Sequence, residues 1–115
     1  MADDTTELIP RVEVPPGRVG IFAIGHEPYW EQFPGLRARL EANAAVFREH
    51  VAARGVEVVD GGLVDTSRHA AEVGEWFRTH PVDLLFCFVA TYATSAVVLP
   101  VVQRAGAGVV LFGLQ

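Results

Sequence analysis

Two short segments of the sequence carry polar and aromatic side chains of the kinds that contact small ligands. Residues 25–33, Gly-His-Glu-Pro-Tyr-Trp-Glu-Gln-Phe, combine an imidazole, two carboxylates and three aromatic rings. Residues 90–95, Ala-Thr-Tyr-Ala-Thr-Ser, add four hydroxyl groups. Carboxylates, imidazoles and hydroxyls exchange hydrogen bonds with hydroxyl groups, and aromatic faces cover C–H surface. The two segments therefore predict binding of a neutral polyhydroxylated molecule, a small sugar.

A purely structural interpretation of the same residues stays open. The rings of Tyr29, Trp30 and Phe33 would then pack the start of the following helix. The hydroxyls of residues 91–95 would cap the helix that comes after them, although four exceed what one cap needs.

The sequence predicts no catalytic residue and no metal site in this chain. The phosphate-binding patterns GxGxxG and GxxxxGK[ST] are absent, and so is the Gly-x-Ser-x-Gly of a nucleophile elbow. His26 and Glu27 are neighbours whose side chains point apart in an extended segment, whereas a divalent metal needs three or four converging ligands. The single cysteine, Cys87, lies in an apolar run and is interpreted as a core residue.

The composition of the chain excludes some classes of binding partner. The 115 residues carry a net charge of −5, and all nine basic residues are Arg, so we expect neither nucleic acid nor an anionic membrane surface as a partner. The longest apolar run, residues 82–90, is too short to span a bilayer, which needs about 20 residues. The acidic start, Met-Ala-Asp-Asp, has no apolar signal region, and we expect a cytoplasmic protein.

Apolar runs alternate with helical patterns from residue 18 onward. Residues 1–17 hold four acidic residues and three prolines without periodicity and are predicted to be a flexible acidic leader. Apolar residues spaced three and four apart at 36–51 indicate an amphipathic helix. Gly61-Gly62 is predicted to be a turn, Asp65 or Thr66 a helix cap, and Pro100 either a kink or a sign that its helix begins near Leu99. The expected strands are 19–24, 56–59, 84–89 and 109–112, and the expected helices are 36–51, 66–80 and 96–105.

Strands that alternate with helices indicate βαβ units and a parallel sheet. We therefore predict a doubly wound α/β domain over residues 18–115, a Rossmann- or flavodoxin-like three-layer sandwich with about four parallel strands. With the flavodoxin-like strand order 2-1-3-4, a crevice opens between the first and third strands, where the two polar segments end up. The last strand, Val109 to Phe112, is entirely apolar, and we expect the chain to be the front part of a longer protein.

These segments, in this order, resemble the N-terminal domain of the L-arabinose isomerase and L-fucose isomerase-like family. The resemblance extends over residues 18–115 and rests on four separated motifs. They are Gly-His-Glu-Pro-Tyr-Trp at 25–30, Gly-Leu-Val-Asp-Thr at 62–66, Ala-Thr-Tyr-Ala-Thr-Ser at 90–95 with Leu-Pro-Val-Val-Gln at 99–103, and Val-Val-Leu-Phe-Gly-Leu-Gln at 109–115.

The resemblance implies a parent enzyme that interconverts an aldose and a ketose, an intramolecular oxidoreductase that uses Mn²⁺ or another divalent metal. Its metal ligands and proton-transferring glutamates belong to later domains, so the resemblance implies no cofactor bound by this fragment. In the arabinose enzymes this domain packs against a neighbouring subunit of a homo-oligomer and contributes polar residues to the neighbour's sugar pocket.

The resemblance also implies which residues contact the sugar. The family's first loop commonly has Gly-Ser-Gln-His-Leu-Tyr, so His26 and Glu27 replace Gln and His while Tyr29 is retained. Its next loop usually has His-Thr-Phe, to which Thr91 and Tyr92 correspond. Gln115 matches a Gln that opens the following substrate loop. The implied substrate-binding residues are His26, Glu27, Tyr29, Thr91, Tyr92 and Gln115.

Two other functions remain open at this point. A free-standing flavodoxin-like sugar-binding or sensor module would bind a sugar by itself, whereas the isomerase fragment would be inactive alone. A flavin or nucleotide binder is a third hypothesis.

Overall fold

The apolar runs of the sequence form one parallel sheet of four strands. The computed structural model describes residues 17–113, within which every strand pair is parallel and the strand order is β2-β1-β3-β4. The strands are β1 (Arg18–Ile24), β2 (Glu57–Val64), β3 (Leu84–Val89) and β4 (Gly108–Phe112). The predicted leader, residues 1–17, and Gln115 lie outside the described residues, except for Gly17.

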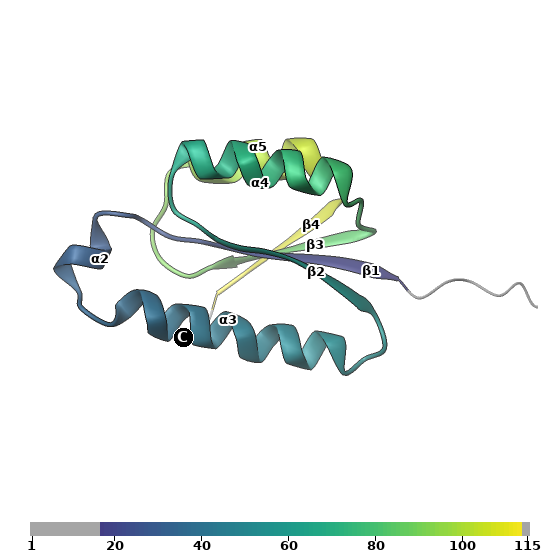
Figure 1. Ribbon diagram of the computed structural model, residues 1–115, viewed down its shortest axis with the longest axis horizontal. Coiled ribbons are helices and arrows are strands. Elements are labelled where there is room, and N and C mark those ends of the chain that lie inside the picture. Colours follow the sequence, from purple (N-terminus) through teal and green to yellow (C-terminus); the bar gives the residue numbers. More distant parts are fainter. Residues whose placement is uncertain (1–16, 114–115) are drawn as a thin grey trace, which may run out of the picture.

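Helices cover both faces of this sheet. The long helix α3 (Leu36–Ala52) lies on one face, and α4 (Ser67–Thr79) and α5 (Ser95–Ala105) lie on the other (Figure 1). The short helix α2 (Tyr29–Gln32) lies at the end of the sheet where β1 finishes (Figure 1). The predicted doubly wound, three-layer α/β sandwich with strand order 2-1-3-4 is thereby confirmed.

The prediction of a turn at Gly61-Gly62 is wrong, because β2 continues through both glycines. The pairing shifts by one residue there: Ile21 of β1 pairs with Asp60, but Phe22 pairs with Gly62. Gly61 is the extra residue of this bulge, and Gly62 has a φ of +76°, which favours glycine. A Cβ on Gly61 would come within 2.8 Å of the Phe77 ring, so the bulge also lets α4 approach the sheet closely.

The helix boundaries follow local signals with one exception. Thr66 caps α4 as predicted, since its Oγ1 accepts a hydrogen bond from the His69 N–H at 3.1 Å. Helix α5 begins at Ser95, one residue before the expected start at Ala96, and includes Pro100. Of the two alternatives for Pro100, a helix start near Leu99 is therefore wrong.

The larger part of the core lies between the sheet and the helix pair α4 and α5. Phe22 and Phe77 are both fully buried there, with ring centroids 6.3 Å apart in an edge-to-face arrangement. The buried members of this cluster come from three strands and both helices: Phe22, Ile24, Val59, Val64, Ala70, Val73, Phe77, Leu85, Cys87, Val97 and Val101.

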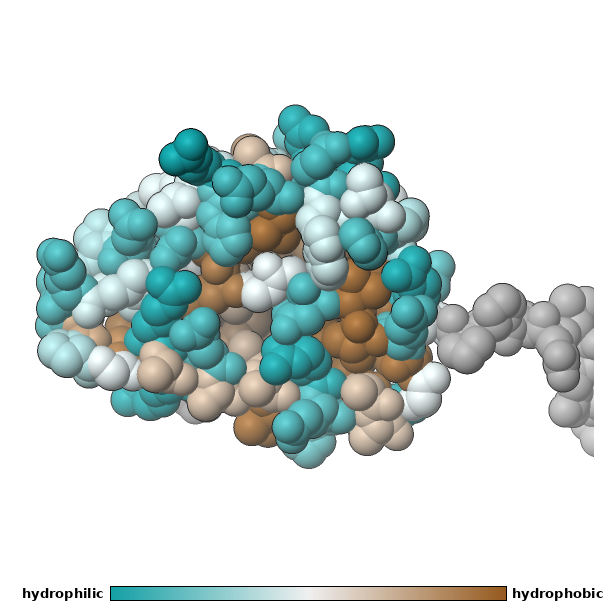
Figure 2. Space-filling view, viewed as in Figure 1, coloured by the Kyte–Doolittle hydropathy of each residue, from teal (hydrophilic) through white to brown (hydrophobic). Residues whose placement is uncertain are grey.

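The α3 face of the sheet is packed less deeply. Of the residues in α3 only Leu40 is buried, and Phe47 instead packs against Phe86 and Phe112 with ring centroids 5.3 and 4.3 Å away. Figure 2 shows apolar side chains at the level of the sheet between helical layers whose outer surfaces are mostly hydrophilic. No helix in residues 17–113 is long and apolar enough to cross a membrane.

The outer strand β4 keeps apolar side chains in contact with solvent. Val109, Val110 and Leu111 are 38%, 40% and 62% exposed, whereas β1, in the middle of the sheet, is buried from Val19 onward. Within residues 17–113, β4 pairs with β3 alone.

A substitution at Gly74 can test how closely α4 and α5 pack. In an isolated helix, Ala in place of Gly would add about 1 kcal/mol of stability. Here the new Cβ would overlap the Pro100 carbonyl oxygen and lie 3.0 Å from the Arg104 Cδ. We expect Gly74→Ala to lower the free energy of urea unfolding by about 1–3 kcal/mol instead. Gly108→Ala is the control, because its nearest atom is 3.8 Å away. A Gly74→Ala variant as stable as the wild type would contradict the packing.

The burial of Cys87 in the core can be tested by measuring how the free energy of unfolding depends on pH. Burial raises the pKa of the Cys87 thiol to about 12, whereas an exposed thiol has a pKa of about 8.5. Because the unfolded chain loses this proton first, we expect the free energy of unfolding to fall between about pH 8.5 and pH 12. Urea titrations across this range should show a shallower fall for Cys87→Ala. Equal pH dependence of the two proteins would show that the thiol is accessible.

Candidate functional site

The loops after β1 and β3 meet at the carboxyl edge of the sheet, where the strand order changes direction. The Ala90 N–H donates to the Ile24 carbonyl at 3.1 Å, and the Gly25 N–H donates to the Val64 carbonyl at 2.9 Å. These bonds hold the ends of three adjacent strands level. Ligands of open α/β sheets bind outside this edge, at the point where the strand order switches.

Trp30 anchors the first loop to the fold. Its indole Nε1–H donates to Asp65 Oδ2 at 2.9 Å, and the Asp65 side chain is only 10% exposed. The six-membered ring of the indole lies against Gly25, where a Cβ would come within 2.8 Å of Trp30 Cζ2. Arg37 adds its guanidinium, 3.5 Å from Asp65 and 5.8 Å from the centre of the Trp30 ring. The structural interpretation therefore holds for Trp30.

An aromatic chain connects the two loops. The His26 ring packs edge-on against Tyr29 from its own loop, with centroids 4.8 Å apart, and against Tyr92 from the other loop, 5.4 Å away. Phe33 extends the chain on the far side of Tyr29, at 5.7 Å. Edge-to-face aromatic pairs at such distances stabilise their arrangement by about 0.5–1.5 kcal/mol each. His26 thus positions a tyrosine on each side of the gap between the loops.

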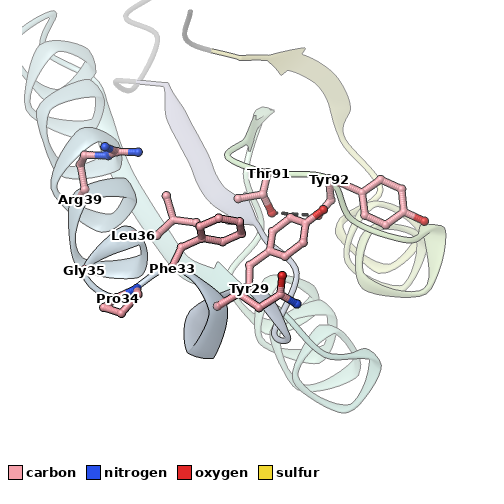
Figure 3. Close-up of a pocket in the computed structure, with 9 residues that line it drawn as sticks. Tyr29, Phe33, Pro34, Gly35, Leu36, Arg39, Thr91 and Tyr92 are labelled. Carbon is pink, nitrogen blue, oxygen red and sulfur yellow. Dashed lines mark hydrogen bonds between the residues drawn. The ribbon is translucent and has the colours of Figure 1, made fainter.

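An open pocket of about 990 Å³ lies between these loops and the start of α3. Figure 3 shows Phe33, Leu36 and Arg39 along one wall, Thr91 and Tyr92 along the other, and Tyr29 between them. The volume is at the upper end of the range for pockets that hold small molecules. The pocket is lined by Tyr29, Gln32, Phe33, Pro34, Gly35, Leu36, Arg39, Thr91 and Tyr92.

The hydroxyl groups of the second loop are not used to cap α5. Thr94 occupies the cap position, but its side chain accepts no capping hydrogen bond. The Thr91 hydroxyl donates to the Tyr92 carbonyl at 2.8 Å, which shapes the loop and keeps the hydroxyl's lone pairs available (Figure 3). Tyr92 itself is 64% exposed. The capping interpretation is therefore wrong for Thr94. Thr91 and Tyr92 both line the pocket, and Figure 3 shows the Tyr92 hydroxyl at the end of its ring that points away from the other lining side chains.

The structure brings together three of the six predicted site residues as pocket lining: Tyr29, Thr91 and Tyr92. His26 lies behind the tyrosine rings and supports them without lining the pocket. Glu27 is exposed and also outside the lining. Its carbonyl accepts a hydrogen bond from the Trp30 N–H at 3.1 Å, so it begins the turn that leads into α2. Gln115 lies outside the described residues.

Sequence reasoning missed two polar residues of the pocket, Gln32 and Arg39. Gln32 ends α2, and Arg39 lies in the first turns of α3, where the sequence pattern shows only a charged residue on the polar side of an amphipathic helix. No motif marks either of them. They line the pocket because α2 and the turn at Gly35 fold the start of α3 back toward the second loop.

The pocket-lining side chains suit binding and orientation more than proton transfer. They include no carboxylate and no imidazole, the groups that most often remove a proton from carbon at neutral pH. In residues 17–113, no group of three or more His, Cys, Asp or Glu side chains is placed to hold a metal ion. The buried thiol of Cys87, with its raised pKa, does not supply a nucleophile.

Comparison with known proteins adds no family to this description: no family model matches the chain, and no curated protein matches it.

The Trp30–Asp65 hydrogen bond gives a test of how the first loop is held. Asp65→Ala leaves the indole N–H without its acceptor and is expected to lower the free energy of unfolding by about 1–3 kcal/mol. Asp65→Asn keeps a side-chain oxygen and should lose less. In a Trp76→Phe background, Trp30 is the remaining tryptophan, and its fluorescence should shift to the red in the alanine variant alone. Unshifted emission in both variants would contradict the anchoring role.

Proposed function

We propose that this chain is the N-terminal substrate-binding and assembly domain of a metal-dependent aldose–ketose isomerase of the L-arabinose or L-fucose type, acting in the cytoplasm. In this proposal the pocket at the carboxyl edge of the sheet forms one side of a sugar site. A neighbouring subunit of a homo-oligomer, or the later domains of a longer chain, supplies the other side.

The observation that carries the proposal is the convergence of the two loops on one pocket. Tyr29 and Phe33 present ring surface, against which the C–H face of a sugar packs. Thr91 and Gln32 supply hydroxyl and amide groups that donate and accept hydrogen bonds, and Tyr92 adds a second tyrosine ring. A polyhydroxylated molecule needs both kinds of surface at once.

The chemistry of the pocket-lining residues indicates which part of the reaction this domain would contribute to the proposed enzyme. Moving a proton between adjacent carbons of a sugar needs a base and an acid, and a divalent metal polarises the oxygens involved. The described residues do not fit a metal ion, and the pocket offers no carboxylate or imidazole. The proposed role of this domain is therefore to bind and orient the sugar, with the reaction carried out by residues of other domains.

The pocket is tested by NMR titration of the isotope-labelled 115-residue chain with L-arabinose and L-fucose. We expect weak, millimolar binding, with chemical-shift changes at Tyr29, Thr91 and Tyr92, because only one side of the site is present. Tyr92→Ala removes an exposed lining ring and should abolish these changes. Leu99→Ala is the control, since Leu99 is 46% exposed and does not line the pocket.

Three outcomes separate the hypotheses. Shift changes at the pocket without conversion of aldose to ketose, even with Mn²⁺ added, support the proposal. Binding tighter than about 10 μM by the chain alone would favour a free-standing sugar-binding or sensor module. Absence of shift changes at the pocket with every sugar would show that it is not a sugar site.

A further inference from the structure

The charge of the pocket differs from what the loop sequence predicts. Glu27 and Glu31 lie in or beside the first loop, yet both are exposed and neither lines the pocket. The one formally charged side chain among the lining residues is Arg39. The pocket is therefore a hydroxyl-rich and aromatic surface with a single positive charge at one wall (Figure 3).

Arg39 is also free of the interactions that occupy other arginines of the structure. Arg37, two residues earlier in α3, is drawn to the opposite side by Asp65 and the Trp30 ring. Arg48 pairs with Asp60 at 2.8 Å. Within residues 17–113, Arg39 forms no ion pair with a carboxylate. Its donors remain available to a ligand.

A neutral sugar does not need this group. Hydroxyls are satisfied by Gln32 and Thr91, whereas a guanidinium matches the two oxygens of a carboxylate or phosphate with two parallel hydrogen bonds. The chain as a whole carries a net charge of −5, so general attraction of anions does not explain such a preference. A bound anion would depend on the local contact with Arg39.

We infer that the pocket takes an acidic sugar derivative, with the polyol chain against Tyr29, Thr91 and Tyr92 and its carboxylate or phosphate at Arg39. This inference rests on the proposed sugar-binding function and adds the class of sugar. Neutral sugars, which the loop sequence predicts as ligands, would bind the same pocket more weakly. Both anions share the chemistry that Arg39 recognises, and the experiment distinguishes them.

The test compares ligands that differ in their anionic group. The labelled 115-residue chain is titrated by NMR with D-arabinose, D-arabinonate, D-arabinose 5-phosphate and inorganic phosphate, at low salt. We expect at least one of the two acidic sugars to bind about tenfold more tightly than D-arabinose, because a hydrogen bond between charged groups contributes more than a neutral one. The preferred acidic sugar identifies the anion.

Variants assign the preference to Arg39. Arg39→Gln should weaken the binding of the preferred acidic sugar about tenfold and so remove most of its advantage over D-arabinose. Arg68→Gln makes the same change of charge at an exposed position of α4 outside the pocket and should leave the preference intact. Circular dichroism of both variants checks that the fold is kept.

The possible failures are distinct. Equal shift changes at the pocket with neutral and acidic sugars would overturn the role of Arg39 and leave the sugar site standing. Binding of inorganic phosphate as tight as that of D-arabinose 5-phosphate would also overturn it, since the polyol chain would then contribute nothing. If neither these ligands nor L-arabinose and L-fucose change the pocket signals, the proposed function itself fails.

Discussion

Parallel pairing of β1 between β2 and β3 is the constraint on which the rest of the molecule depends. Parallel strands need crossover connections, and right-handed crossovers place α3 on one face of the sheet and α4 and α5 on the other. The same arrangement puts the carboxyl ends of all four strands at one edge. The loops after β1 and β3 therefore adjoin because of the strand order, and the contact between the His26 and Tyr92 rings adds to it.

Close contact between the helices and the sheet depends on glycine as much as on apolar side chains. The fully buried ring of Phe77 lies where a Cβ on Gly20 or Gly61 would come within 2.8 Å of it. Gly74 allows the backbone of α5 to approach α4 at Pro100 in the same way. The α4 and α5 face is therefore the more deeply packed side of the sheet, whereas α3 buries only Leu40 and packs its Phe47 ring against Phe86 and Phe112.

The two loops divide their residues between structure and binding. Trp30 and Asp65 tie the first loop to the end of β2, and His26 sets the spacing of Tyr29 and Tyr92 across the gap. The residues left facing the pocket are those whose polar atoms the fold does not need. The pocket is therefore lined by aromatic rings, hydroxyl groups and one positive charge. The first loop, by contrast, contains two carboxylates in its sequence, and neither of them lines the pocket.

The sequence by itself determined the four strands, the helices α3, α4 and α5 and their order, because apolar periodicity and capping by residues such as Thr66 act over a few neighbouring residues. The short helix α2 was not predicted. It also pointed to Tyr29, Thr91 and Tyr92, since loops after parallel strands share an edge. Only the tertiary structure decided that β2 continues past Gly61, that Glu27 does not line the pocket and that Arg39 does. Those outcomes depend on Phe77, Trp30 and the turn at Gly35, contacts between residues whose packing no local pattern records.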